Sequence, residues 1–459
     1  MLSLYNSLTK SKKMFKPING SKVSMYTCGP TVYDHVHIGN LRSFITADLL
    51  QRVLRSVEGY DVDWILNITD VDDKMISKIK KNNPDEEPMQ ALGKMADTYT
   101  DMFISDIESV GIRRADIKKL PRATDHIDSM QELIKRLLRE KIAYISEGSV
   151  YFSLDAYKKT GKEYGVLVNL DYDPQQRVVD DQDQKNGVGD FALWKARKDD
   201  EPSWDFIWID KNYPGRPGWH IECSAMSTEY LGNIFDIHTG GIDLKFPHHE
   251  NEIAQCGGQQ AKFFIHNEFL NVEGEKMSKS LGNVTTLNDM SDPLAFRLQV
   301  LQAHYRSHMD FSVDSLYAAK ERLNNLRSYA DSMTLAWPGQ IPEQDNSGLT
   351  KKFLSEFEEA LSDDLNTPAA LASLNILEGK VYSQETLAAL KVVEGILGIG
   401  LVDNRDLTSE ERALITDYDN TRELKEYVKS DKIRKELIDK YNLSVSDTQF
   451  GPLVSRVRD

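Results

Sequence analysis

The pattern that most constrains this chain is a strand, a helix and a second strand, which follow one another between residues 23 and 68. Residues 23–27 (VSMYT) are typical of a short buried strand that enters a Gly-Pro turn. Apolar residues then recur at helical spacing to about Ser56, and residues 60–68 (YDVDWILNI) alternate in part as a strand does. Such a unit requires parallel strands and a right-handed crossover. We therefore expect an α/β protein whose ligands bind at the carboxyl ends of the strands.

Residues 37–40 (HIGN) stand between this turn and the helix. A glycine turn that leads into a helix N-terminus is a generic phosphate site, because backbone N–H groups and the helix dipole both face the anion. The imidazoles of His35 and His37 and the amide of Asn40 stand at the same place. This stretch predicts a nucleotide site.

A second marked stretch is residues 274–283 (GEKMSKSLGN). Lys276 and Lys279 lie three residues apart among small and hydroxyl residues, and such a loop can clamp a polyphosphate. A solvated charged loop is the commoner role of a lysine pair. The lysine pair therefore indicates a polyphosphate site only in combination with HIGN in a chain that contains a strand–helix–strand unit.

Length, charge and cysteine content narrow the class of protein. A chain of 459 residues is too long for one compact core, so about two to four domains are expected. A net charge of −16 argues, taken alone, against a nucleic-acid partner, although a local basic face can still bind RNA. The three cysteines do not form a disulfide framework, and no apolar leader or membrane span is visible. A cytoplasmic enzyme without membrane association is expected.

Helical and strand-like segments alternate along the rest of the chain before about residue 293, and the chain is mostly helical after it. Residues 124–140 predict a helix capped by Thr124. Residues 409–441 predict one last helix, followed by a small β-like tail.

HIGN followed by KMSKS is the signature pair of class I aminoacyl-tRNA synthetases. Together with TCGPTVYDHVHIGN, NITDVDDK, PGWHIECSAM and HTGGIDLKFPHHENEIAQ, these motifs resemble the cysteinyl-tRNA synthetase family. The resemblance continues through HYRSHMDFS and DDLNTP, so it covers nearly the whole chain.

The resemblance implies a Rossmann-type parallel-sheet catalytic domain with an inserted connective domain, a mostly α-helical C-terminal region and a small terminal domain. The expected boundaries are 1–112 for the first half of the catalytic domain, 113–205 for the connective insertion, 206–292 for the second half with the KMSKS loop, 293–345 for a stem-contact region, 346–401 for a helical bundle and 402–459 for a small anticodon-binding domain.

The resemblance also implies one Zn²⁺ per subunit. Its ligands would be Cys28, Cys223, His248 and Glu252. Spacing alone does not predict this set, although a helix would point residues 248 and 252 to one side. Zinc binds a thiolate strongly and a hydroxyl weakly, so it would select cysteine over serine without an editing site. His249 is expected to have a supporting role and Cys256 to pack in the core.

The implied reaction joins L-cysteine and Mg²⁺-bound ATP into cysteinyl-adenylate and transfers the cysteine to the 3′ end of tRNA(Cys). The implied catalytic residues are His37, Asn40, Lys276 and Lys279. The implied ATP-binding residues are His35, His37, Gly39, Asn40, Gly240, Asp243 and Lys279. The implied amino-acid pocket contains Thr69, Trp219 and His238. For His35, a structural role is as open as ATP contact.

The match weakens in three places. Residues 171–190 are unusually acidic for the insertion, and HIGN replaces the more familiar HIGH. The C-terminus lacks the tryptophan that family members place at the anticodon. Phe450 could stack in its place, with Arg456 and Arg458 for phosphate, and a frayed basic tail is the alternative.

Two other functions stay open at this point, and a monomer is expected. A related ligase would transfer activated cysteine to an amino sugar, but such enzymes lack the full anticodon-binding extension. A catalytically silent RNA-binding homologue would not need HIGN, KMSKS and four intact metal-ligand positions.

Overall fold

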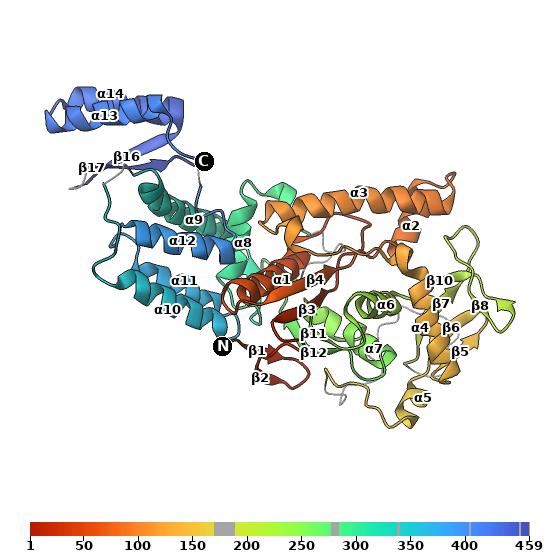
Figure 1. Ribbon diagram of the computed structural model, residues 1–459. Helices are drawn as coiled ribbons and strands as arrows, with labels where there is room; N and C mark the ends of the chain where they lie inside the picture. Colours follow the sequence, from red (N-terminus) through yellow and green to blue (C-terminus); the bar gives the residue numbers. More distant parts are fainter. Residues whose placement is uncertain (169–188, 277–283, 337–339, 404, 449–450, 459) are drawn as a thin grey trace. The chain divides into compact units, whose positions relative to one another are not determined.

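The computed structural model describes residues 1–168, 189–276, 284–336, 340–403, 405–448 and 451–458. It divides into two compact units. The first contains residues 3–290 and 305–310, and the second contains residues 291–304 and 311–459 (Figure 1). Within the described ranges, no helix has both the length and the apolar character needed to cross a bilayer.

A parallel four-stranded sheet forms the centre of the first unit. Its order is β12 (Ala261–Asn267), β11 (Phe235–Gly241), β3 (Lys22–Thr27) and β4 (Asp61–Leu66). The helix α1 (Ile38–Ser56) connects β3 to β4 and packs on β4 and β11, which confirms the predicted strand–helix–strand unit. Figure 1 draws α1 and α6 (Trp219–Leu231) on either side of these strands.

Burial explains why these segments form the sheet and its cover. Every residue of β11 is buried, which is the pattern of a strand covered on both faces. The helix α1 buries Leu41, Phe44, Ile45 and most of the apolar positions that follow them. The strand β11 begins only at Phe235, far along the chain from β3, and yet the two strands are neighbours in the sheet. This order brings the end of β3 next to segments that are distant in the sequence.

The remaining elements of the first unit surround this sheet. A second, antiparallel sheet has the order β10-β7-β6-β5 and extends from Ala143 to Pro217. The bounds of the other elements are β1 Ser3–Asn6, β2 Ser11–Met14, α2 Asp73–Asn82, α3 Pro88–Ser109, α4 Ile127–Arg139, β5 Ala143–Ser146, β6 Ser149–Phe152, α5 Leu154–Lys159, β7 Phe191–Ala196, β8 Ile207–Trp208, β9 Lys211–Asn212, β10 Gly215–Pro217, α7 His248–Gln255, β13 Leu270–Val272, β14 Glu275–Lys276 and β15 Met309–Phe311.

The prediction that Thr124 caps a helix is wrong. A 3₁₀ turn at Ala123–His126 precedes α4, and neither element has a side-chain cap. Thr124 instead donates its backbone N–H and its hydroxyl to the two carboxylate oxygens of Asp70, at 2.9 and 2.6 Å. Asp70 is buried just beyond β4, and burial raises its pKa. The buried carboxylate needs these donors, which accounts for the changed helix start.

The second unit is mostly helical, as the sequence predicted. Its elements are α8 Pro293–Leu301, α9 Val313–Thr334, α10 Leu349–Ser362, α11 Thr367–Ser373, α12 Gln384–Leu397, α13 Ser409–Glu423, α14 Tyr427–Tyr441, β16 Leu443–Thr448 and β17 Gly451–Arg456. The predicted β-like tail is the antiparallel hairpin of β16 and β17.

The prediction of one helix over residues 409–441 is wrong, because the chain turns between α13 and α14. Lys425 adopts a left-handed conformation (φ 61°), and the N–H of Glu426 donates to Thr421 O at 2.8 Å. Ile415 of α13 and Ile433 of α14 are buried in one cluster with the hairpin. Two packed helices bury both apolar faces, which a single straight helix cannot do.

Two arginines hold the terminal hairpin through one buried carboxylate. Asp331 of α9 is fully buried, and its oxygens lie 2.5 Å from Arg456 Nη1 and 2.8 Å from Arg458 Nη1. The backbone N–H of Arg456 also donates to Asp331 at 3.0 Å. The expectation that these arginines meet RNA phosphate is therefore not retained, and Phe450 lies outside the described residues.

Replacing Asp331 with alanine should destabilise the second unit. The change leaves two largely buried guanidinium groups without their carboxylate, for which a loss of about 3 kcal/mol in the free energy of unfolding is expected. Urea denaturation followed by circular dichroism measures it. Asp417→Ala breaks an exposed pair with Lys429 and is the control, with a much smaller expected loss. Equal losses in both variants would contradict this account of the hairpin.

Candidate active site and metal centre

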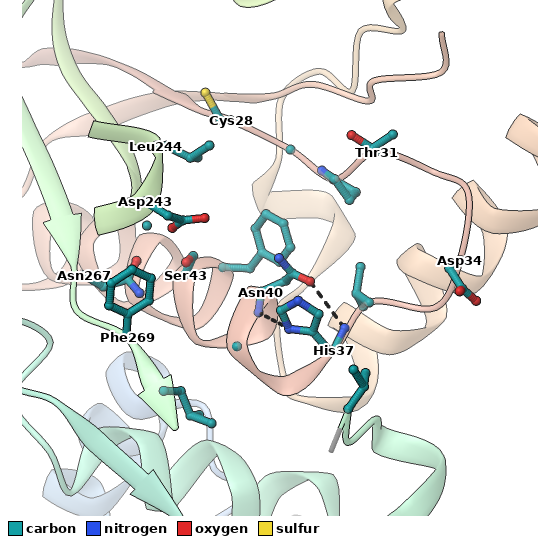
Figure 2. Close-up of a pocket in the computed structure, with 18 of the residues that line it drawn as sticks. Cys28, Thr31, Asp34, His37, Asn40, Ser43, Asp243, Leu244, Asn267 and Phe269 are labelled. Atoms are coloured by element: carbon teal, nitrogen blue, oxygen red, sulfur yellow. Dashed lines mark hydrogen bonds between the residues drawn. The ribbon is translucent and has the colours of Figure 1, made fainter. Parts of the chain in front are cut away.

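A cavity of about 580 Å³ lies at the carboxyl ends of β3, β11 and β12. It is lined by residues at or just after the end of each strand, and among them are Cys28, Asp243 and Asn267. The start of α1 closes another side with His37 and Asn40. Figure 2 shows these side chains around the same cavity. The site is therefore where the parallel sheet predicted ligand binding.

His37 and Asn40 cap α1 reciprocally. The backbone N–H of Asn40 donates to His37 Nδ1 at 3.2 Å, and the N–H of His37 donates to Asn40 Oδ1 at 3.4 Å (Figure 2). Because Nδ1 accepts, the neutral ring carries its proton on Nε2. HIGN thus forms a capping box whose imidazole presents an N–H donor at a helix N-terminus that favours anions.

The other ATP candidates are placed unequally. His35, Gly39 and Asp243 line the cavity, and the ring of His35 also lies edge-on to Tyr99. Gly240 is not among the lining residues. A Cβ there would lie 2.9 Å from His249 Cε1, so close packing requires this glycine.

Gly241 was missed by the sequence reading. It lines the cavity, and a Cβ would lie 2.4 Å from Asp243 Oδ1. The GGID motif contained the signal, since two glycines preceded the candidate aspartate.

The four predicted metal ligands converge. Cys28 follows β3, Cys223 lies on α6, and His248 and Glu252 lie on α7. One ligand atom from each lies within 4.8 Å of the others. The two sulfur atoms are 3.6 Å apart, and His248 Nε2 is 3.2 Å from Glu252 Oε1. All four side chains are buried.

The chemistry of these donors fits a metal such as zinc. Burial raises the pKa of the Cys28 thiol and lowers the pKa of His248, so both groups are neutral when the site holds no cation. Two thiols, an imidazole and a carboxylate, all buried, are ligands that suit a tetrahedral ion with affinity for sulfur, such as Zn²⁺. A metal ion bound here would give all four groups a common partner.

The structure also offers a second donor group, which the sequence reading did not anticipate. Cys28, His238, His249 and Glu252 meet the same distance limit. His249 Nε2 is 3.4 Å from Cys28 Sγ, and its Nδ1 is 2.8 Å from His266 Nε2. His249 is thus also a candidate ligand, and its expected supporting role stays a prediction.

The predicted amino-acid pocket residues lie around the metal group. The indole of Trp219 lines the cavity and stacks on His248, with ring centroids 4.2 Å apart. Thr69 donates its hydroxyl to Glu222 Oε2 at 2.9 Å. His238 is fully buried, with Nε2 3.1 Å from Glu252 Oε2.

Glu222 is a further residue that the sequence reading missed. It is fully buried beside Cys223, and burial raises the pKa of its carboxyl group. Its place inside PGWHIEC was the available signal.

Of the two predicted lysines, the structure describes the backbone of Lys276 and leaves Lys279 undescribed. Lys276 lies in β14, where its backbone pairs with Asn271 of β13. Lys279 lies outside the described residues, as do residues 277–283. Cys256 is only partly buried and is in neither donor group.

Comparison with known proteins agrees with the arrangement of the first unit. Residues 14–321 match the family described as "tRNA synthetases class I (C) catalytic domain", and residues 356–401 match the DALR domain. Solved structures with a similar fold include a Mycobacterium tuberculosis methionyl-tRNA synthetase in complex with methionyl-adenylate. It has a TM-score of 0.53 at 13% identity and covers 87% of this chain and 84% of its own. At that identity the likeness concerns the fold alone.

Relatives with assigned names match the chain from end to end. The Cysteine--tRNA ligase of Brachyspira hyodysenteriae is 38% identical over 97% of this chain and 98% of its own length. The Cysteine--tRNA ligase of Caldicellulosiruptor saccharolyticus is 37% identical over 100% of both chains. The strand–helix–strand site, the metal-ligand group and these end-to-end matches agree, and the chain belongs to the cysteine–tRNA ligase family of class I tRNA synthetases.

Proposed function

We propose that this chain activates L-cysteine with Mg²⁺-bound ATP to cysteinyl-adenylate and transfers the cysteine to the 3′ end of tRNA(Cys), with a zinc ion selecting the substrate thiolate. The observation that carries the proposal is the position of the metal-ligand group. Cys28 belongs to that group and also lines the cavity that begins at HIGN. A thiol held there would place the amino acid beside the nucleotide.

The nucleotide side of the proposal rests on the start of α1. The Nε2–H of His37 and the positive end of the helix dipole would face the phosphates. Asp243, at the start of the 3₁₀ turn after β11, would bind the ribose hydroxyls, and Gly241 would leave room for close approach. The attack of the cysteine carboxylate on the α-phosphate then needs positioning and charge stabilisation rather than a general base.

Substrate choice follows from the metal ligands. Cys28, Cys223, His248 and Glu252 would hold the ion, and a bound zinc ion accepts a thiolate far more readily than a serine hydroxyl. The stacked rings of Trp219 and His248 form the adjoining wall and limit side-chain size. An apolar pocket alone would separate cysteine from serine by only about 1–3 kcal/mol. We therefore assign selection to the donor group.

The tRNA side of the proposal rests on the turn between α13 and α14. Tyr427 is 53% exposed, and the guanidinium of Arg422 lies 5.1 Å from its ring centroid. Lys425, Lys429 and Lys432 line the same shallow cavity as Tyr427. An exposed ring among cations suits a stacked nucleobase and its phosphates. This surface takes the role that the sequence reading gave to the C-terminal arginines.

One assay series tests the function as a whole. The chain should catalyse cysteine-dependent exchange of pyrophosphate into ATP, because adenylate formation is reversible. It should then charge tRNA(Cys) and leave an amino-sugar acceptor unmodified. Absence of exchange would favour the silent homologue, and transfer to the amino sugar would favour the related ligase.

Replacing Cys223 with serine tests the metal ligands. The variant should bind zinc more than about tenfold more weakly and lose cysteine-dependent exchange, because a thiolate ligand is removed. Metal analysis after dialysis against a weak chelator measures the first effect. Cys256→Ser removes the one cysteine outside both donor groups and should change neither quantity. Full zinc content in Cys223→Ser would refute the assignment.

Replacing Tyr427 with alanine tests the tRNA surface. Stacking is worth roughly 1–3 kcal/mol per base, so kcat/KM for tRNA should fall about tenfold or more, with pyrophosphate exchange unchanged. Aminoacylation at limiting tRNA measures this. Tyr427→Phe keeps the ring and should retain charging. An alanine variant that charges tRNA normally would exclude this surface.

A further inference from the structure

Arg42 is a fully buried arginine two residues after HIGN, and it holds three backbone carbonyls. Its Nη1 donates to Phe269 O at 2.6 Å. Its Nη2 donates to Ser307 O at 2.6 Å and to Tyr305 O at 3.3 Å. These carbonyls belong to two segments of the first unit that are far from α1 in the sequence. The guanidinium therefore joins the start of α1 to both segments.

The first of these segments leads directly to Lys276, a predicted catalytic lysine. Phe269 lines the active-site cavity and immediately precedes β13. The strand β13 pairs with β14, and Asn271 lies opposite Lys276. The second segment supports the first, because the N–H of Met309 donates to Phe269 O at 3.2 Å. Arg42 thus fixes the backbone that carries Lys276.

A second contact from the same turn of α1 reaches the other side of residues 277–283. The N–H of Ile38 donates to the carbonyl of Thr285 at 3.1 Å. The neighbours of Thr285, Val284 and Thr286, line the cavity. The segments before and after the KMSKS stretch are therefore both attached to the start of α1, which His37 and Asn40 cap.

The guanidinium group suits the first attachment. Three carbonyl oxygens that converge in the interior need several donors in one plane, which the guanidinium fork supplies and an ammonium group does not. Burial lowers the pKa of Arg42 to about 10, with Glu268 opposing the change, so the side chain stays charged at neutral pH. The Arg42 side chain is also too deeply buried to touch a nucleotide itself.

We propose that Arg42 is a positioning residue for adenylation, which holds the backbone of the β13–β14 hairpin, and with it Lys276, in place through the carbonyls that it binds. The inference rests on the proposed function, and it adds a residue to which sequence motifs gave no role. A displaced lysine would reach the pyrophosphate poorly in the transition state while cysteine binding at the metal group persists. The effect should therefore fall on kcat for exchange and on the KM for ATP, and spare the KM for cysteine.

A double-mutant cycle tests the proposal on the full chain. Arg42→Lys should lower the rate of pyrophosphate exchange on the order of 100-fold, the loss expected from a displacement of about 1 Å. Lys276→Ala should lower the rate of the wild type strongly and the rate of the Arg42→Lys chain only weakly. The two fold-losses should differ by a factor of about ten or more, because the two residues act as one unit.

The matched control is Arg52→Lys, on the same helix. Arg52 is also buried, and it binds Asp48 at 2.8 Å and Gly111 O at 2.6 Å, away from the cavity. In this background Lys276→Ala should act as in the wild type. Thermal unfolding and titration of active sites by the adenylate burst correct each rate for the folded fraction. Arg42→Gln, which keeps an N–H₂ donor of smaller size, is the second variant if Arg42→Lys does not fold.

The outcomes separate the two proposals. Independent effects of Arg42 and Lys276, or equal losses in Arg42→Lys and Arg52→Lys, would overturn the positioning role. A raised KM for cysteine with an unchanged KM for ATP would also overturn it. A wild-type chain without cysteine-dependent exchange would overturn the proposed function and this inference with it.

Discussion

The structure of the first unit depends on the burial of polar side chains at one edge of a parallel sheet. His248 and Glu252 would each cost free energy in the interior if they stood alone, and the thiols of Cys28 and Cys223 lie beside them. They meet because β11 lies beside β3, although α1, β4 and the whole antiparallel sheet of β5, β6, β7 and β10 separate these strands in the sequence. The sheet order therefore builds the donor group, and the donor group gives its polar members partners.

The same edge explains why two binding functions share one cavity. Cys28 directly follows β3, and His37 caps α1 at the other end of the same connection. One short connection thus carries a metal ligand at one end and a helix N-terminus at the other. The reciprocal bonds of His37 and Asn40 fix that N-terminus. Arg42, on the same helix, binds the carbonyl of Phe269, which also lines the cavity. The connection therefore joins the candidate metal-ligand group to the start of α1.

Local signals were sufficient for part of this description. The strand–helix–strand unit was visible because β3, α1 and β4 are adjacent and strongly patterned. The donor group came only from resemblance, since sheet order cannot be read from spacing. The turn at Lys425 has neither glycine nor proline, so packing of the two apolar faces decided it. Thr124, Arg456 and Arg458 were misjudged for one reason, because each satisfies a buried carboxylate that is distant in the sequence.

The most direct measurement is the zinc-edge X-ray absorption of the purified, zinc-loaded chain with and without L-cysteine. The account predicts two sulfur neighbours at about 2.3 Å from Cys28 and Cys223, and a third when cysteine is added. One sulfur with two nitrogens would instead identify the group of Cys28, His238, His249 and Glu252. That result, or a sulfur number that cysteine does not change, would contradict selection of the substrate thiolate by the metal.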